Sequence, residues 1–244
     1  MVKAGRLGRV VSAKAGRYKR AALPKRIDTM PDTATQRLNM VEAQVRANDV
    51  TEPRIAQAMR EVPREQFVPA AKKGIAYAEL PIEVVRDRYL LEPRTFAKLL
   101  QLAEVVPSDS VLDIACATGY STAVLARLAK AVIGLEQDAD LVRIATGALA
   151  GTHNATIAQG AFVEGFAAKA PYDVIFINGA VETVPDALFA QLGEGGRLVA
   201  AIKEGALCRG VLYLREHGRI GHRTAFDASA PTLAGFRNSV GFVF

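Results

Sequence analysis

The stretch from Ser110 to Asp138 constrains the fold of this chain more than any other segment. It starts with a short apolar run that ends on an acidic residue, and a loop of small residues comes next, Ala115 to Gly119. An amphipathic segment then leads to a second apolar run, which ends at Glu136. A strand, a tight turn, a helix and a parallel strand in this order are the minimal unit of a doubly wound sheet. The sequence therefore predicts an α/β fold.

The acidic residue that ends the second apolar run indicates what this unit binds. In a doubly wound sheet a ligand lies across the carboxyl ends of the strands, where an acidic side chain can hold ribose hydroxyls. Glu136 occupies this position, so the unit predicts a cofactor that contains a nucleoside. A dinucleotide-binding loop has the pattern G-x-G-x-x-G, whereas Ala115, Ala117 and Gly119 are spaced by two. A nicotinamide-dependent oxidoreductase is therefore the least favoured interpretation.

The spacing of the loop resembles the D/E-x-G-x-G-x-G motif of class I S-adenosylmethionine-dependent methyltransferases. Asp113 stands at the head of the motif, and alanine replaces its first two glycines at positions 115 and 117. The resemblance implies S-adenosyl-L-methionine as the cofactor and a doubly wound, mostly parallel sheet of seven-stranded type. The same residues would also suit an ordinary strand, turn and helix without a ligand.

Composition bounds the class of protein. A chain of 244 residues, half of them hydrophobic, is long enough for one large domain with a real core, and no apolar run is long enough to span a membrane. Its cysteines, Cys116 and Cys208, have no metal-ligand spacing and suit a reducing compartment. His153, His217 and His222 are scattered and are expected at the surface. We therefore expect a cytoplasmic protein without a metal site.

The net charge of +6 comes from the start of the chain, because residues 1–29 contain nine basic side chains and one acidic one. This segment has little helical periodicity, so we interpret it as a disordered basic arm. It is an upstream extension with Met30 as the true start, a transit segment, or a contact for an anionic partner. The first explanation is favoured, since everything that resembles a folded domain comes after Met30, and we expect residues 30–244 to form a single domain.

Two helices are expected before the sheet. The spacing of apolar residues predicts a helix over residues 36–48 with Thr35 as its N-cap. A second helix is expected after it, with Thr51 as N-cap and Pro53 in its first turn. These helices form an N-terminal helical preamble to the α/β domain.

The second half of the chain supplies the remaining strands. The runs APYDVIFIN and RLVAAI are predicted strands, with the turn GEGG before the second. Pro185 is expected to open a helix that extends to Leu192. Residues 211–215 and Gly241 to Phe244 are expected to finish the sheet around the turn HGRIG. No internal repeat is present.

A second resemblance covers most of the chain. The run MVEAQVRANDVTEPRIAQAMREVPREQFVP, then AY with a proline four residues later, then a short loop ending in proline, precedes the unit described above. This order is similar to the protein-L-isoaspartate O-methyltransferase family, over about residues 38–203, and the closing GFVF resembles that family's terminal strand. Within the family the chain looks most like a divergent bacterial branch, whose loop reads GCATGY where this chain has ACATGY.

The family resemblance implies a function. The chain is expected to transfer a methyl group from S-adenosyl-L-methionine to a carboxylate of damaged protein sites, so its partner is a protein or peptide with an altered aspartyl residue. The family has a serine in the motif T-I-S-x-P, and the matching residue here is Leu91, with Tyr89 as an alternative source of a hydroxyl. The family's G-D-G turn matches positions 160–162, where the acid is absent and Phe162 would flank the adenine or pack in the core.

No catalytic residue is assigned, because methyl transfer to an already ionised carboxylate asks little of acid or base catalysis. Asn178 is expected as a polar group at the end of a strand. The full set of expected cofactor-binding residues is Asp113, Ala115, Cys116, Ala117, Thr118, Gly119, Tyr120, Glu136, Gln137, Gly160, Ala161, Phe162 and Asn178.

Two alternative functions remain open at this point. Because Leu91 makes the acceptor side more apolar, one alternative is a methyltransferase of the same fold with another acceptor. The other is a non-catalytic binding module of this fold. Outside residues 1–29 the charge is nearly balanced, so a nucleic-acid partner is expected only through the basic arm, and the sequence assigns no oligomeric state.

Overall fold

The computed structural model describes residues 32–236. The expected basic arm, residues 1–29, and the expected closing strand, Gly241 to Phe244, lie outside the described residues. The described range includes every other segment for which the sequence predicts a helix or a strand.

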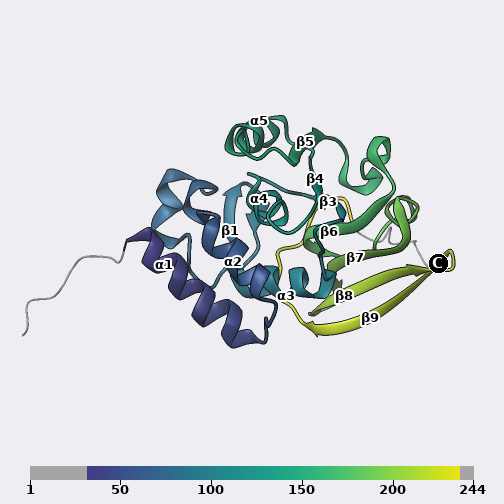
Figure 1. Ribbon diagram of the computed structural model, residues 1–244, viewed down its shortest axis with the longest axis horizontal. Helices are drawn as coiled ribbons and strands as arrows, with labels where there is room; N and C mark the ends of the chain where they lie inside the picture. Colours follow the sequence, from purple (N-terminus) through teal and green to yellow (C-terminus); the bar gives the residue numbers. More distant parts are fainter. Residues whose placement is uncertain (1–31, 237–244) are drawn as a thin grey trace, which may run out of the picture. The chain divides into compact units, whose positions relative to one another are not determined.

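A seven-stranded sheet forms the centre of the fold (Figure 1). Its strand order is β5-β4-β3-β6-β7-β8-β9, with parallel pairing from β5 to β7 and antiparallel pairing of β8 and β9. The strands are β3 (Ser110–Ile114), β4 (Ala131–Glu136), β5 (Ala155–Gln159), β6 (Tyr172–Val181), β7 (Leu192–Glu204), β8 (Leu207–Glu216) and β9 (Arg219–Asp227). This arrangement confirms the predicted mostly parallel, seven-stranded sheet.

The order of the strands reverses at the centre of the sheet. β3 lies between β4, which is the next strand in the chain, and β6, which comes later. A crevice forms at the carboxyl ends of parallel strands where successive connections leave on opposite sides, and ligands of doubly wound sheets bind there. The loop after β3 lies at this position, as the sequence predicts.

Both faces of the sheet are buried at its central strands β3 and β6, where successive side chains point to opposite faces, whereas β9 is mostly exposed. Val111 and Phe176 belong to the hydrophobic cluster on one face, whereas Leu112 and Ile175 belong to the cluster on the other face. Helices on each side complete these two cores. The helices are α1 (Thr33–Met40), α2 (Pro53–Glu61), α3 (Pro93–Ala103), α4 (Tyr120–Leu125), α5 (Ala139–Ala148) and α6 (Asp186–Phe189).

Shorter elements connect these helices and strands. A small antiparallel hairpin, β1–β2, lies between the helical preamble and α3. The short elements are η1 (Val41–Val45), η2 (Arg46–Asn48), η3 (Arg64–Gln66), η4 (Ala70–Ile75), β1 (Ile82–Val85), β2 (Arg88–Leu90), η5 (Phe162–Glu164) and η6 (Ala167–Lys169).

The helical preamble is present, but its two predicted N-caps are wrong. The first helical run starts at Thr33, and the carboxylate of Asp32 accepts the hydrogen bond from the Thr35 amide at 2.7 Å. The second helix is capped by Glu52, whose carboxylate accepts from the Arg54 amide at 3.1 Å, whereas the Thr51 hydroxyl donates to the side-chain oxygen of Gln101 at 3.4 Å. In both cases a neighbouring side chain took the role that the sequence pattern gave to threonine.

Three predictions for the second half of the chain need correction. The helix opened by Pro185 is short and ends at Phe189, and Leu192 begins β7 instead. The turn GEGG lies within the bounds of β7, whose pairing with β6 is irregular in this region. Residues 219–227 form the edge strand β9, which supplies the seventh strand among the described residues.

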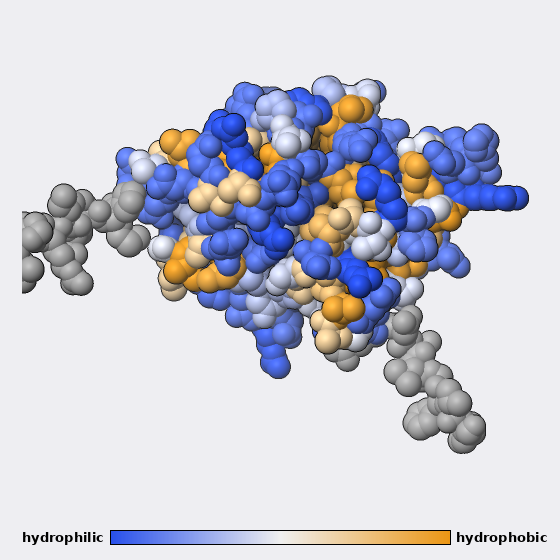
Figure 2. All heavy atoms as spheres, turned by 90° about the horizontal axis from the view of Figure 1, so that it is seen from below, coloured by the Kyte–Doolittle hydropathy of each residue, from blue (hydrophilic) through white to orange (hydrophobic). Residues whose placement is uncertain are grey.

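The surface shown in Figure 2 is mainly hydrophilic, with hydrophobic residues in separate patches between polar ones. Among residues 32–236, no helix has the length and apolar character needed to cross a membrane.

Candidate functional site

The loop after β3 has the backbone conformation of a glycine-rich loop, although alanine supplies two of its positions. Ala115 and Ala117 have φ angles of 63° and 52°, and Gly119 has 94°. These values lie in the left-handed region, which costs a non-glycine residue about 1–2 kcal/mol. The amides of Ala115 and Cys116 both donate to the carbonyl of Leu135 in β4, at 2.9 and 3.3 Å, so the loop is fixed to the neighbouring strand.

Asp113, at the head of the loop motif, has hydrogen-bond partners within the protein for both of its carboxylate oxygens. One of its carboxylate oxygens accepts from the hydroxyls of Ser121 and Thr122 at 2.7 and 2.6 Å. The other accepts from the side-chain amide of Asn178 at 2.6 Å. Burial raises the pKa of Asp113 to about 6, against the lowering effect of these hydrogen bonds. Asp113 therefore joins β3, α4 and β6 below the loop.

Glu136 ends β4 with a fully buried side chain beside the loop. One oxygen accepts from the amides of Gln137 and Asp138 at 2.9 and 3.2 Å. The other accepts from the Ala117 amide at 3.0 Å and pairs with the guanidinium of Arg88. The carboxylate thus has the expected position, and each of its oxygens already has two donors.

Arg88 reaches the loop from the hairpin. Its guanidinium lies over the ring of Phe162, with 4.7 Å between the guanidinium carbon and the ring centroid. The Arg88 side chain is only 10% exposed, and its Nε lacks a hydrogen-bond partner within the described part of the chain. Arg88 therefore connects the two residues that the sequence assigns to the ribose and the adenine, Glu136 and Phe162.

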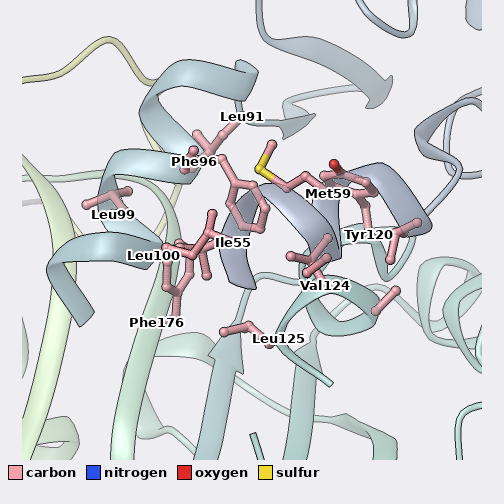
Figure 3. Close-up of a cluster of buried hydrophobic side chains, with 14 of the residues drawn as sticks. Ile55, Met59, Leu91, Phe96, Leu99, Leu100, Tyr120, Val124, Leu125 and Phe176 are labelled. Carbon is pink, nitrogen blue, oxygen red and sulfur yellow. The ribbon is translucent and has the colours of Figure 1, made fainter. Parts of the chain in front are cut away.

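Leu91, at the position where a serine was expected, is a core residue. Figure 3 shows its side chain beside Phe96, in the cluster of buried hydrophobic residues that also includes Met59 and Tyr120. The Leu91 side chain is 3% exposed. This position therefore contributes to packing, and it offers no hydroxyl to a ligand.

Tyr120 lies at the start of α4 and packs into the same core. Its ring centroid lies 5.7 Å from that of Phe67 and 5.6 Å from that of Phe96. Arg64 lies on another side of the ring, with its guanidinium carbon 4.8 Å from the centroid. Sequence reasoning expected Tyr120 at the cofactor, whereas most of its surface is in contact with the protein core.

Arg64 is a buried cation with one unused donor. Its Nε donates to the Ala76 carbonyl at 2.8 Å, and its Nη2 donates to the Leu91 carbonyl at 2.7 Å. Within residues 32–236, neither Arg64 Nη1 nor the Tyr120 hydroxyl has a hydrogen-bond partner. Burial lowers the pKa of Arg64 and raises that of Tyr120. A buried donor of this kind is costly unless a partner is supplied.

Two small cavities, each of about 10 Å³, lie beside the hairpin, and Ala115 and Cys116 of the loop line one of them. Tyr89, Leu91 and Asn178 line both of them, and Arg64 lines one. Tyr89 is opposite Glu83 in the hairpin, and this carboxylate raises the pKa of the phenol above its ordinary value. Tyr89 is therefore a neutral phenol that lines the same cavities as Leu91.

The other expected residues surround the loop in different roles. The Thr118 hydroxyl donates to the Phe67 carbonyl at 2.6 Å, and burial raises the pKa of the Cys116 thiol. The Gly160 amide donates to the Glu136 carbonyl at 3.0 Å, which brings residues 160–162 next to the end of β4. Gln137 is exposed beside them. The fold thus brings the expected residues together at one edge of the sheet.

A much larger cavity lies away from the loop. A cavity of about 700 Å³ is lined by residues that include Arg54, Gln101, Val106 and Arg197. It borders the segment before β3, at the amino ends of the parallel strands. Because ligands of doubly wound sheets bind at the carboxyl ends, we assign the functional site to the loop after β3.

Comparison with known proteins identifies the family. The family model described as protein-L-isoaspartate(D-aspartate) O-methyltransferase matches residues 35–223. The chain belongs to the protein-L-isoaspartate O-methyltransferase family. It is 35% identical to the protein-L-isoaspartate O-methyltransferase of Koribacter versatilis over 80% of this chain and 88% of that protein. The relative from Methylorubrum extorquens is 36% identical over 73% of this chain and 79% of that protein.

Solved structures of the protein-L-isoaspartate O-methyltransferase family have the same fold. One matches with a TM-score of 0.72 and 24% identity, over 82% of this chain and 66% of that chain. A Plasmodium falciparum chain, solved in complex with S-adenosyl-L-homocysteine, matches with a TM-score of 0.70 and 20% identity, over 81% of this chain and 97% of that chain.

Sequence reasoning missed four residues of the candidate site. Ser121 and Thr122 bind Asp113, and their position just after a glycine at a helix start was a usable signal. Arg88 contacts Glu136, and Arg64 contacts the ring of Tyr120, each from a distant segment. Nothing in the local pattern around either arginine indicates this.

Proposed function

We propose that this chain binds S-adenosyl-L-methionine at the loop after β3 and transfers its methyl group to the carboxylate of an isoaspartyl residue in a protein. Membership of the family supports this activity. The observation that carries it is the buried carboxylate of Glu136, which ends β4 beside a loop of left-handed residues at the reversal point of the sheet.

The residues present fit this cofactor at three points. Glu136 would accept hydrogen bonds from the ribose hydroxyls, and the ring of Phe162 would flank the adenine. The unused donor of Arg64 suits the carboxylate at the amino-acid end. One side chain, Arg88, stands between Glu136 and Phe162 and would have to move.

The proposed cofactor-binding residues are the ones expected from the sequence, and they form two groups that differ in their contacts. Glu136, Phe162 and the loop backbone would contact the ligand, whereas Asp113 and Asn178 would support the loop from below. The proposed set is Asp113, Ala115, Cys116, Ala117, Thr118, Gly119, Tyr120, Glu136, Gln137, Gly160, Ala161, Phe162 and Asn178, with Arg64 added.

The cofactor, when bound, supplies a methyl group on a cationic sulfur that an ionised carboxylate can attack directly. The protein's task is then to align the reactants and exclude water. The buried leucine at position 91 excludes water on the acceptor side, and the neutral hydroxyl of Tyr89 would donate to the acceptor carboxylate. Neither residue has to transfer a proton, since the carboxylate is ionised at neutral pH. A cytoplasmic location, where the protein would meet such damaged substrates, is part of the proposal.

Two measurements test this function. Titration calorimetry with S-adenosyl-L-homocysteine should give a saturable binding isotherm. Methyl transfer from radiolabelled S-adenosyl-L-methionine should occur to a peptide with an isoaspartyl residue and not to the same peptide with ordinary aspartate. Absence of heat at millimolar ligand would contradict the cofactor assignment, and equal labelling of the two peptides would contradict the acceptor.

A further inference from the structure

The hairpin β1–β2 contributes the side chain that closes the candidate site. Arg88 is the first residue of β2, and it comes after a turn in which Asp87 has a φ of 60°. From there its guanidinium reaches the carboxylate of Glu136, which is 48 positions away in the sequence. The hairpin therefore lies against the carboxyl end of β4.

Arg88 makes contacts of the kind that an adenosyl group would make. Its Nη2 donates to Glu136, as a ribose hydroxyl would. Its planar guanidinium faces the ring of Phe162 at 4.7 Å, as a planar base would. With Arg88 in place, the two cavities beside the hairpin measure about 10 Å³ each, and neither Glu136 nor Phe162 lines them. A site for a ligand of this size is typically about 300 Å³ or more.

We infer that Arg88 is an internal competitor of the adenosyl group, so that the free protein has a closed site and the cofactor binds only when Arg88 leaves Glu136. This inference rests on the proposed function, because it concerns the affinity of the same site. It assigns to Arg88 a role in setting cofactor affinity.

The contacts of Arg88 are consistent with a side chain that can leave. Among residues 32–236 its hydrogen-bond acceptor is Glu136, and its buried Nε lacks a partner. The strand that carries it is three residues long, and Arg86 and Asp87 of the adjoining turn are highly exposed. Ile82, Val84 and Leu90 of the hairpin are buried in the hydrophobic core, so the opening we infer is a rotation of the Arg88 side chain on a fixed hairpin.

Competition of this kind lowers the apparent affinity by a calculable factor. The apparent dissociation constant equals the intrinsic one divided by the fraction of protein in the open state. If the state in which Arg88 has left Glu136 is about 1% of the population, removing the competitor tightens binding about 100-fold. If the open state is about 10% of the population, removing the competitor tightens binding about tenfold.

The test is titration calorimetry of the full chain with S-adenosyl-L-homocysteine, comparing the native protein with Arg88→Gln. Glutamine is shorter and uncharged, so it cannot both pair with Glu136 and cover the ring of Phe162. Arg86→Gln is the matched control, because it removes the same charge from the same hairpin at a side chain that is 95% exposed. Thermal melting of each variant first verifies that it is folded.

We expect Arg88→Gln to bind the ligand at least tenfold more tightly than the native protein, and Arg86→Gln to bind it like the native protein. Equal or weaker binding by Arg88→Gln would overturn the competitor role while leaving the proposed function intact. Failure of all three proteins to bind would overturn the proposed function itself. If Arg88→Gln does not fold, Arg88→Lys is measured instead, since lysine keeps the charge and lacks the planar group. It should bind more tightly than the native protein by a smaller factor, and unchanged binding would overturn the inference.

Discussion

The side-chain amide of Asn178 on β6 donates to the carboxylate of Asp113 on β3, with 2.6 Å between Nδ2 and Oδ1. The same amide nitrogen donates to the Ile114 carbonyl at 3.0 Å. These bonds join the two central strands directly below the loop. Because Asp113 is fully buried, its charge depends on this amide and on two hydroxyls from α4. The stability of the loop should therefore respond to pH through Asp113.

Asp113→Asn is expected to change the pH dependence of folding. The pKa of Asp113 is about 6 in the folded protein, and its ordinary value is 3.8. The folded state therefore binds one more proton than the unfolded state between these values, and the free energy of unfolding falls as pH rises from about 4 to about 6. The loss is about 3 kcal/mol.

The measurement for Asp113 is urea unfolding of the native protein and of Asp113→Asn at pH 4 and pH 7. Other groups titrate in both proteins, so the difference between the two free energies isolates Asp113. This difference should shift in favour of the native protein at pH 4. A shift of the opposite sign would refute the raised pKa.

Ala115→Gly and Ala117→Gly are expected to stabilise the protein. Both alanines have positive φ angles, and this strain costs about 1–2 kcal/mol. Glycine removes the strain, but the greater entropy of the unfolded chain offsets about 0.4–1 kcal/mol of the gain. Each change should therefore raise the free energy of unfolding by about 0.5–1 kcal/mol in chemical denaturation. The control is Ala97→Gly in α3, which has helical geometry and should lose about 1 kcal/mol. A loss of stability at position 115 or 117 would contradict the strain.

Leu91→Ser is expected to destabilise the protein without increasing methyl transfer. The leucine side chain is 3% exposed in the hydrophobic cluster, so its removal leaves a cavity and buries a hydroxyl. The loss should be about 3 kcal/mol or more. Leu80→Ser, at a side chain that is 40% exposed, should change stability by about 0.5 kcal/mol or less. A stable Leu91→Ser variant with faster methyl transfer to an isoaspartyl peptide would show that position 91 serves the acceptor.

Arg64→Lys is expected to affect the two ends of the cofactor differently. Lysine keeps the charge, but its donors lie on one nitrogen, so it cannot reach the Ala76 and Leu91 carbonyls from two separate nitrogens and present a third to a ligand. Binding of S-adenosyl-L-homocysteine should weaken about tenfold, as expected for one charged hydrogen bond. Binding of 5′-methylthioadenosine, which lacks the amino-acid end, should not change. Equal weakening of both ligands in calorimetry would contradict a role for Arg64 at the carboxylate.

The fold was predictable because its signals are local. The alternation and length of the apolar runs determine β3, β4 and β6, and the small residues at 115–119 determine the turn between β3 and α4. One N-cap error is local, since Asp32 rather than Thr35 caps the first helix. The other involves a tertiary contact, since the Thr51 hydroxyl donates to Gln101 of α3 and Glu52 caps α2.

The candidate site was only partly predictable. Glu136 and Phe162 could be placed from the strand end and the turn after β5, because each belongs to a local pattern. The ion pair of Glu136 could not be predicted, since its partner Arg88 is 48 positions away on a hairpin with no motif of its own. The burial of Leu91 likewise depends on Phe96 and Met59, which come from other elements.

The sequence by itself determined the strand, loop and helix that form the site, the acid that ends the next strand, and the family to which the chain belongs. Spacing along the chain suffices for these features, because backbone conformation and side-chain alternation are set by near neighbours. Only the tertiary structure decided that a guanidinium lies between Glu136 and Phe162. Ion pairs and ring contacts form between side chains that folding brings together, so their partners depend on the packing of whole elements rather than on any local pattern.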